Sequence, residues 1–524
     1  LIANWVNTAR TINMNVSVLP LASLRNKETD LPTRTSIVSA ELLAQNKQYK
    51  DALSELFRVD IANKFALQPQ RISQLYNYAW QWYSKTDESS RATLANSYPV
   101  LAQYKTIFDT IQNSSIDDSE RQASIREWLQ MHPNELFTQY LPQQVEEYLA
   151  ITSLENPNIA VLLPLSGRLA AQGTAIKQGI LAAYYSKLRH AQENGELLDT
   201  YIEFIDTASE NELSAAVNDE SLYGFDTIIG PLLRSHIDQM EAFDLSQKHH
   251  LVLNQTQFEK TEEALNSVVQ VSFSLAPEQE AEQLVALMRS RNISNPIVIN
   301  DGSGTAQRMK AAFVDAWNAP YLFEEQHNNP LQHIQYTDNK SMRVGITSAL
   351  DVLQSERRIN QLSNLQTETV HSVTRNRRDI DAFVIFARPN DVELINPIIE
   401  SSISLFTNDH IPVFSPSYGF DHKQEKNSQR DLRNLVFVDM PWLMLKDKNE
   451  DLRQSVEQLF NEPPSSFLRL FAFGHDAYAL VDNLAQLTTF KHLSIAGLSG
   501  ELSVGKDQQL VRKLSSMSIN DTNL

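Results

Sequence analysis

The sequence contains no cysteine, and this absence excludes several kinds of chemistry. A chain without cysteine forms no disulfide, offers no thiolate to a metal ion and has no cysteine nucleophile. The absence fits a reducing and an oxidising compartment equally well. Cysteine usage therefore does not identify where the protein works.

Long apolar runs and a surplus of basic residues are also absent. No stretch reaches the roughly 18 to 20 apolar residues that a membrane-spanning helix needs, so the sequence predicts none. The 45 Lys and Arg residues are outnumbered by 64 Asp and Glu residues, which gives a formal net charge of -19. Such a charge repels nucleic acid and anionic membrane surfaces in general, and we expect no nucleic-acid partner.

The chain is long and apolar enough to fold into more than one domain. Its 524 residues exceed one ordinary core, and a hydrophobic content of 42% is sufficient to bury each of several cores. Leu1–Arg10 (LIANWVNTAR) has the pattern of an amphipathic helix rather than of a signal peptide. We therefore expect any targeting segment to lie outside this chain.

Amphipathic helices are predicted throughout residues 1–152. Apolar residues recur at three- and four-residue spacing, and proline residues or polar stretches separate the periodic segments. The predicted helices cover residues 36–59, 72–83, 94–111 and 119–131. Helical hairpins stacked as tetratricopeptide-like repeats would explain this pattern, and a plain helical bundle is the alternative.

The pattern changes near Ser153, and short buried strands then alternate with helices over residues 153–524. This alternation predicts a parallel, doubly wound α/β fold, and the length predicts two lobes with a cleft between them. The predicted strands cover residues 159–163, 201–205, 227–229, 251–253, 296–299, 382–386, 411–414 and 435–438.

Residues 159–185 (IAVLLPLSGRLAAQGTAIKQGILAAYY) consist of a buried strand, a Pro-Leu-Ser-Gly loop and a helix with two glycines. This segment resembles the opening of type I periplasmic binding proteins, in which the loop lies at the rim of the cleft. FIDTAS, DTIIGPLLR and IVINDGSGTAQRMKAAFVDAW follow in the same order of strand, turn and helix. The resemblance implies a two-lobed α/β domain of that type.

Residues at the predicted strand ends are candidates for the cleft rim. By position, Ser166 and Thr174 would supply hydroxyl groups to a ligand, together with backbone amides. Asp206 and Thr207 close a strand, where they either contact a ligand or only form a turn, and Gly and Pro fix the bend after the next strand. The rim candidates are Pro164, Ser166, Gly167, Thr174, Asp206, Thr207, Gly230 and Pro231.

The helical region ahead of this module, with IAVLLPLSG, GPLL, FGHDAYAL (473–480) and GLSGELSV (497–504), resembles the LppC family of penicillin-binding-protein activators. The resemblance implies an outer-membrane lipoprotein on the periplasmic side, which binds a class A penicillin-binding protein and stimulates its transpeptidase activity without catalysis of its own. It implies no cofactor or metal, and use of the fold for protein docking rather than for a small molecule. It also implies a lipid anchor that this chain lacks and a helical domain longer than the one here. The alternative is a periplasmic ligand-binding protein for an amino acid or muropeptide.

The stretch from Asp338 to Ile380 contains no predicted strand and is rich in arginine. We interpret it as an insertion that contains a helix, and its basic end is either a solvated loop or a docking surface for an anionic partner. Its arginines are Arg357, Arg358, Arg375, Arg377 and Arg378.

Three motifs test the enzymatic interpretations. Residues 500–507 (GELSVGKD) match a phosphate loop except for its final Ser or Thr, and they are expected in a hairpin rather than before a helix. Residues 301–304 (DGSG) follow a strand but lack the third glycine of a dinucleotide turn, so a tight turn before a helix is predicted. His475 and Asp476 would be the catalytic pair of a hydrolase, the third interpretation of the chain. As neighbours on a helix, they are predicted not to form a hydrogen-bonded pair.

His249 and His250 are adjacent, without the helical spacing that would direct both at one metal ion. We predict that they are surface residues.

Overall fold

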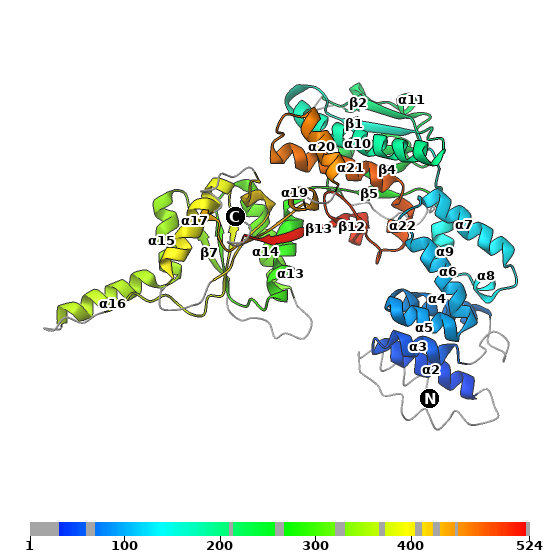
Figure 1. Ribbon diagram of the computed structural model, residues 1–524, viewed down its shortest axis with the longest axis horizontal. Helices are drawn as coiled ribbons and strands as arrows, with labels where there is room; N and C mark the ends of the chain where they lie inside the picture. The colour runs from blue at the N-terminus through cyan, green and yellow to red at the C-terminus, as the bar shows by residue number, and fades with distance from the viewer. Residues whose placement is uncertain are drawn as a thin grey trace.

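The computed structural model describes residues 31–58, 69–208, 213–256, 267–319, 331–365, 372–403, 411–422, 430–445 and 449–519. The helix predicted over Leu1–Arg10 lies outside these ranges. Figure 1 shows a column of helices that leads up to one α/β lobe, beside which a second α/β lobe lies. The domain limits at residues 152 and 153 remain a prediction, although α9 ends at Ala150 and β1 begins at Ile159.

The amino-terminal part is entirely helical in the described residues. From α2 to α8 the principal contacts join helices that are one or two apart along the chain, as in stacked helical hairpins, whereas α9 packs mainly against α22 (Leu484–Thr489). The helices are α2 (Leu31–Gln45), α3 (Tyr49–Leu56), α4 (Pro69–Ser84), α5 (Glu88–Ser97), α6 (Pro99–Gln112), α7 (Asp118–Met131), α8 (Leu136–Gln139) and α9 (Gln143–Ala150).

Two predicted helices are each interrupted once. The segment 36–59 forms α2 and α3, because Lys47 adopts a left-handed conformation with φ of 60° between them. The segment 94–111 divides at Pro99, which lacks a backbone N–H and occupies the first turn of α6. Periodicity alone does not detect either interruption, since the apolar spacing continues across it.

The core of the helical column is aromatic. The ring of Trp80 lies 5.6 Å from that of Tyr104 and 5.7 Å from that of Phe108, measured between centroids. Phe137 packs edge-on against Tyr104 at 5.2 Å. Aromatic contacts of this kind add specific geometry to the burial of large apolar side chains.

The first lobe contains a five-stranded parallel sheet in the order β2-β1-β3-β4-β5, the order of a doubly wound fold. β1 is the run IAVLL, and all five of its residues are buried, which is typical of a central strand covered on both faces. Its strands are β1 (Ile159–Leu163), β2 (Ile202–Asp206), β3 (Thr227–Ile229), β4 (His249–Val252) and β5 (Gln270–Ser272).

The second lobe contains a six-stranded sheet in the order β14-β10-β9-β8-β6-β7, with β14 antiparallel at one edge. The two-lobed architecture predicted from the resemblance to type I periplasmic binding proteins is confirmed. Its strands are β6 (Pro296–Asn300), β7 (Gln332–Gln335), β8 (Ala382–Phe386), β9 (Val413–Ser415), β10 (Leu435–Asp439) and β14 (Ser515–Ser518).

The sequence did not predict β5, β7, β14 or the strand at Ile495–Ala496, whereas the strands at 501–504 and 510–513 form the hairpin that it led us to expect around residues 500–507. β7 reads QHIQ and buries only one residue, and β14 reads SSMS, so neither carries the apolar run of a buried strand. A third, antiparallel sheet joins the lobes with strands β11 (Ile495–Ala496), β12 (Glu501–Val504) and β13 (Leu510–Lys513).

Helices cover both sheets, and two of them come from distant parts of the chain to pack in the first lobe. These are α10 and α21, which are described below. The helices of the α/β part are α10 (Ala170–Asn194), α11 (Asp219–Leu222), α12 (Arg234–Ile237), α13 (Pro277–Ser290), α14 (Gly304–Asn318), α15 (Asn339–Ala349), α16 (Val352–Leu365), α17 (Pro389–Ser402), α19 (Pro441–Met444), α20 (Glu450–Leu459), α21 (Ser465–Val481) and α22 (Leu484–Thr489).

The backbones of α10 and α21 touch where two glycines face the partner helix. A Cβ on Gly179 would lie 2.0 Å from the carbonyl oxygen of Phe471, and one on Gly474 would lie 2.1 Å from that of Ile176. No side chain larger than hydrogen fits at either position without separating the helices. The late segment α21 is therefore an integral part of the first lobe.

Within the described part of the chain, no helix is long and apolar enough to cross a membrane.

Candidate functional site

The predicted rim residues of the first lobe gather at the carboxyl ends of neighbouring strands. β1 and β2 are parallel and pair Leu163 with Asp206, so the loop after β1 lies beside the end of β2. Asp206 Oδ1 accepts hydrogen bonds from the backbone N–H groups of Leu165 at 2.7 Å and Ser166 at 3.3 Å. Ser166 and Gly167 are exposed, and Pro164 is buried behind them.

The carboxylate of Asp206 organises this loop. Partial burial acts to raise the pKa of Asp206, but hydrogen bonds from the Ser166 side chain and the Leu165 backbone outweigh it and hold the pKa below its ordinary value. The loop amides that would bind the carboxylate of an amino acid are thus already paired with Asp206. Its neighbour Thr207 is buried and donates its backbone N–H to Leu163 at 2.9 Å.

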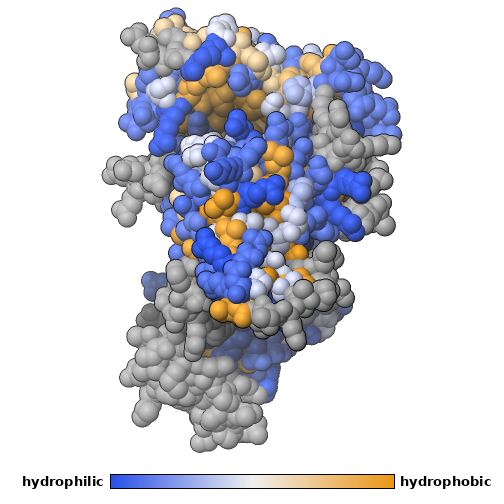
Figure 2. Space-filling model, turned by 90° about the vertical axis from the view of Figure 1, so that its left-hand side faces the viewer, coloured by the Kyte–Doolittle hydropathy of each residue, from blue (hydrophilic) through white to orange (hydrophobic). Residues whose placement is uncertain are grey.

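α10 begins directly against the same loop. A Cβ on Gly173 would lie 2.0 Å from the carbonyl oxygen of Pro164, so only glycine permits this approach. Thr174 follows it and is exposed. Seen from the side on which α16 projects, the upper part of the molecule, formed by the first lobe, is hollowed, and hydrophobic residues line the hollow (Figure 2).

The Gly230-Pro231 turn follows β3, next to β1. Gly230 has a φ of 107°, its peptide bond to Pro231 is cis, and a Cβ on it would lie 2.4 Å from the carbonyl oxygen of Leu162. His250 Nε2 lies 2.7 Å from the Gly230 carbonyl oxygen and donates to it as a neutral imidazole. The buried side chain of His250 therefore stabilises this turn.

The prediction that His249 and His250 are surface residues is wrong. Both belong to β4, which begins two residues earlier than predicted, and His250 is only 2% exposed. Burial lowers the pKa of His250 to about 4, against the smaller opposing effect of its hydrogen bond to Gly230. His249 Nε2 lies 2.6 Å from the carbonyl oxygen of Thr152, in the segment that leads out of the helical column.

Buried charges connect the two lobes. Arg469, on α21, donates through Nη2 to Asp439 Oδ2 of β10 at 2.6 Å, and His422 Nε2 lies 2.9 Å from the same oxygen. Burial acts to raise the pKa of Asp439, but the hydrogen bonds from His422 and Arg469 lower it overall. Sequence reasoning missed this cluster, because its members are isolated charges from three separate segments.

A second buried contact holds α13 to the turn after β9. Glu280 accepts hydrogen bonds from the backbone N–H of Ser417 at 2.9 Å and from its hydroxyl at 3.0 Å. Arg512 of β13 lies 3.9 Å from Glu280 and is buried. These contacts stabilise the region where the third sheet crosses from one lobe to the other.

The structure corrects the prediction for His475 and Asp476. His475 Nδ1 lies 3.4 Å from Asp476 Oδ1, so the neighbours do approach each other, although the contact is long. The carboxylate of Asp476 also accepts shorter bonds from the backbone N–H groups of Leu498 at 2.8 Å and Ser499 at 2.7 Å. It thereby fixes the turn between β11 and β12.

The two motifs that resemble nucleotide-binding loops lie in the structural settings that the sequence predicts. Residues 500–507 extend from β12 into its connection with the antiparallel β13, so they lie in a hairpin and not before a helix. Residues 301–304 form the turn between β6 and α14, where Ser303 Oγ caps the helix by accepting the N–H of Ala306. Among the described residues, no group of three or more His, Cys, Asp or Glu side chains is placed to hold a metal ion.

The interpretation of residues 338–380 as one insertion is wrong for α15, which packs in the core of the second lobe through Met342 and Ile346, and only α16 projects from the lobe (Figure 1). No residue of α16 is buried, and Arg357 and Arg358 are exposed. The returning segment is tied to the base of this helix, since Arg375 N donates to Ser355 Oγ at 2.9 Å and Arg377 N donates to Leu350 O at 3.0 Å. Arg377 also pairs with Asp379 at 2.5 Å, whereas Arg378 is exposed.

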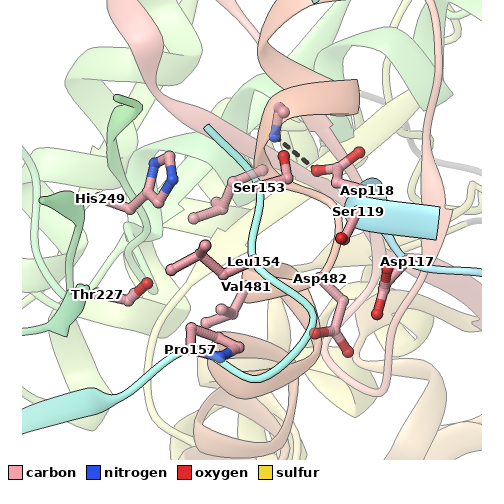
Figure 3. Close-up of a pocket in the computed structure, with 12 residues that line it drawn as sticks. Asp117, Asp118, Ser119, Ser153, Leu154, Pro157, Thr227, His249, Val481 and Asp482 are labelled. Atoms are coloured by element: carbon pink, nitrogen blue, oxygen red, sulfur yellow. Dashed lines mark hydrogen bonds between the residues drawn. The ribbon is translucent and has the colours of Figure 1, made fainter. Parts of the chain in front are cut away.

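A small pocket of about 30 Å³ lies where the helical column meets the first lobe. Figure 3 shows Asp117, Asp118 and Asp482 on one side of it and Thr227 and His249 on the other. The linker that carries Leu154 crosses between them. The volume accommodates about one water molecule, so this is a junction rather than a ligand site.

A buried ion pair anchors this junction. Arg121 Nη1 donates to Asp118 Oδ1 at 2.6 Å, and these side chains are 0% and 5% exposed. Asp118 also accepts from the Tyr148 hydroxyl at 2.8 Å and from the backbone N–H of Ala485, on α22, at 2.8 Å. Burial raises the pKa of Asp118 to about 6, against the opposing effect of Arg121. The helical column is therefore fastened to the first lobe by groups from both.

This chain resembles known proteins both in sequence and in fold. Residues 95–521 match the family described as LppC putative lipoprotein. A protein of Aliivibrio fischeri named penicillin-binding protein activator LpoA is 27% identical over 79% of this chain, which spans 64% of that relative's length. A protein of Photobacterium profundum with the same name is 27% identical over 91% of this chain and 74% of its own length.

Solved structures of Haemophilus influenzae LpoA share the fold. One matches with a TM-score of 0.67 at 18% identity, covering 98% of this chain and 85% of that chain. Its separate C-domain, described as a regulator of PBP1A, matches with a TM-score of 0.50 at 20% identity, covering 70% of this chain and 98% of the domain. Since the family match extends over most of the chain, this protein belongs to the LppC putative lipoprotein family.

Proposed function

We propose that this protein is a non-catalytic regulator of peptidoglycan synthesis, which binds a class A penicillin-binding protein and stimulates its transpeptidase activity. The observation that carries the proposal is the family match over residues 95–521, together with relatives that are named penicillin-binding protein activators. The description of the family as putative lipoproteins supports a place at the outer membrane, on its periplasmic side, with a lipid anchor outside this chain.

The junction between the helical column and the first lobe supports a spacer role for the column. Asp118 and Arg121 on α7 are bonded to the segment around α22, and Phe490 of that segment packs on Trp80 with centroids 6.4 Å apart. Because these contacts fix the column to the first lobe, the column holds the lobe in a defined orientation and does not swing on a loose linker. Stacked helical hairpins are suited to span distance in one direction.

Activation further requires that the protein bind the active state of the synthase more tightly than its resting state. A difference of about 1 to 3 kcal/mol is typical of coupling between two sites. The basic insertion is a candidate for one contact, since Arg357 and Arg358 are exposed on a projecting helix of an otherwise acidic protein.

The direct test is peptide cross-linking by the cognate class A penicillin-binding protein, with and without the full chain. We expect cross-linking to rise with this chain and not when a non-cognate synthase replaces the cognate one. An Arg357→Ala, Arg358→Ala variant tests the insertion, and Arg343→Ala, an exposed arginine on α15, is its matched control. No rise in cross-linking and no binding to the synthase would refute the proposal.

The second candidate is a periplasmic binding protein for an amino acid or muropeptide. Exposed Ser166 and Thr174 at the rim of the first lobe favour it, whereas the pairing of the loop amides with Asp206 opposes it. A panel of ligands in a thermal-shift assay separates the two functions. A ligand at 100 times its Kd would add about 2.7 kcal/mol of stability.

A further inference from the structure

The first lobe exposes large hydrophobic side chains at the amino-terminal edge of its sheet. Leu197 is 82% exposed, Tyr201 is 56% exposed and Tyr223 is 87% exposed. We call these three residues the tyrosine patch. All three lie in the segments that lead into the amino-terminal ends of β2 and β3, and large hydrophobic residues exposed on one edge of a sheet mark interaction surfaces.

Topology brings the members of the patch together. Tyr201 directly precedes β2 and Tyr223 precedes β3 by a few residues, and both strands pair in parallel with β1. The ring of Tyr201 stacks on that of Phe225, with centroids 6.1 Å apart and planes 20° apart. This edge, which carries α11 in Figure 1, is opposite the carboxyl ends of the strands, where the predicted rim residues lie.

The loop between α10 and β2, which carries Leu197, is fixed in place. Gly195 ends α10 in a left-handed conformation with φ of 76°, and Glu196 N donates to Ala191 O at 2.8 Å. Asp199 N donates to Asn156 Oδ1 at 3.0 Å. A surface that is ordered before it binds loses less conformational entropy on association, which favours affinity.

The segments that carry the patch, residues 195–206 and 213–227, contain acidic side chains and no lysine or arginine. Lys248, directly before β4, is half-buried and donates its Nζ to the carbonyl oxygen of Phe225 at 2.8 Å. The exposed acidic residues are Glu196, Asp199, Glu203, Asp219 and Glu220. Tyrosines at the centre and charges of one sign at the rim are the arrangement of a protein interface, in which aromatic residues provide affinity and charges select the partner.

We propose that the tyrosine patch is a docking surface for a protein that presents an apolar centre ringed by lysine and arginine side chains. The inference rests on the proposed function, in that the partner tested is the class A penicillin-binding protein. It adds a contact on the first lobe that is separate from the basic insertion on the second lobe. A second copy of the chain is a poor occupant, because each copy carries a formal net charge of -19.

The test measures binding of the full chain to the purified cognate synthase, by calorimetry at two salt concentrations. Tyr223→Ala is expected to weaken binding roughly 30-fold, the effect of removing a central aromatic anchor. Tyr185→Ala is the matched control, since Tyr185 is a 59% exposed tyrosine on α10 outside the patch, and it should leave the Kd unchanged. Glu220→Lys should weaken binding and reduce its dependence on salt.

Four outcomes are distinguishable. Loss of binding in Tyr223→Ala but not in Tyr185→Ala, with melting temperatures unchanged, supports the docking surface. Equal binding by both variants and the parent overturns the tyrosine patch and leaves the proposed function standing. No binding by the parent chain refutes the proposed function, and the inference falls with it. Concentration-dependent dimerisation that Tyr223→Ala abolishes would assign the patch to a second copy and overturn the basic partner.

Discussion

The contact between α10 and α21 leads to a sharp prediction for Gly474→Ala. The added methyl carbon would lie 2.1 Å from the carbonyl oxygen of Ile176, where ordinary contact is 3.4 to 4 Å, and both elements are rigid backbone. The helices must therefore separate by roughly 1 Å or more, and overpacking of this kind costs about 1 to 3 kcal/mol, with rigid backbone at the upper end. The better helix propensity of alanine returns up to about 1 kcal/mol.

The expected net loss is therefore about 2 kcal/mol, or a fall of about 4 to 8 °C in the melting temperature of the first lobe. Scanning calorimetry of the full chain measures the melting temperature. Hydrogen exchange of peptides from α10 and α21 shows whether the loss is confined to this lobe.

The matched control is Gly304→Ala, the same substitution on a different helix. Gly304 begins α14, and nothing lies within 4 Å of the position of its Cβ. The control should be neutral or more stable by up to about 1 kcal/mol. A Gly474→Ala variant that melts within 1 °C of the parent, with unchanged exchange in α10, would refute the close-contact reasoning.

Three further predictions test buried polar groups. His250 has a pKa of about 4 in the folded state and 6.5 in the unfolded state, so the stability that depends on its neutral form is present above pH 6.5 and is lost as the pH falls towards 4. In urea unfolding across this pH range, His250→Gln should make the loss of stability smaller by about 3 kcal/mol. Arg121→Met leaves the buried carboxylate of Asp118 unpaired and should cost about 3 to 5 kcal/mol, seen as faster proteolysis at the junction, with partial recovery on adding Asp118→Asn. Asp476→Ala strands the buried N–H groups of the turn at 497–500 and should cost about 2 to 4 kcal/mol, with faster hydrogen exchange in that turn; unchanged exchange there would contradict its structural role.

The sequence predicted those elements whose own residues form a distinctive pattern. The run IAVLL predicted β1 because a strand covered on both faces must be apolar throughout. The ends of the strands that follow predicted the positions of Asp206 and of the Gly230-Pro231 turn. β7 and β14 were missed because a sheet edge tolerates polar residues. Helix interruptions at Lys47 and Pro99 were missed because one residue turns the backbone while the apolar spacing continues.

Contacts between distant segments could not be predicted from local sequence patterns. Asp118 and Ala485 are bonded across 367 positions, and neither residue has neighbours in sequence that mark it as special. Similarly, the link between Asp439 and Arg469 exists only because α21 returns to the first lobe after β6 to β10 of the second lobe, with β14 still to follow. His250 was misassigned for a related reason, since its burial depends on strands that its local sequence does not reveal.

The return of α21 also sets the order in which the molecule can be completed as its chain is made. Lys187 of α10 and its partner Asp482 are 295 positions apart. At about 5 to 20 residues per second, the ribosome needs roughly 15 to 60 s to synthesise the interval between them. During that time the glycine face of α10 has no α21 to cover it, and the helical column has no α22. The first lobe therefore begins to fold long before its two carboxyl-terminal helices exist, so a newly made chain depends on protection from aggregation until those segments arrive.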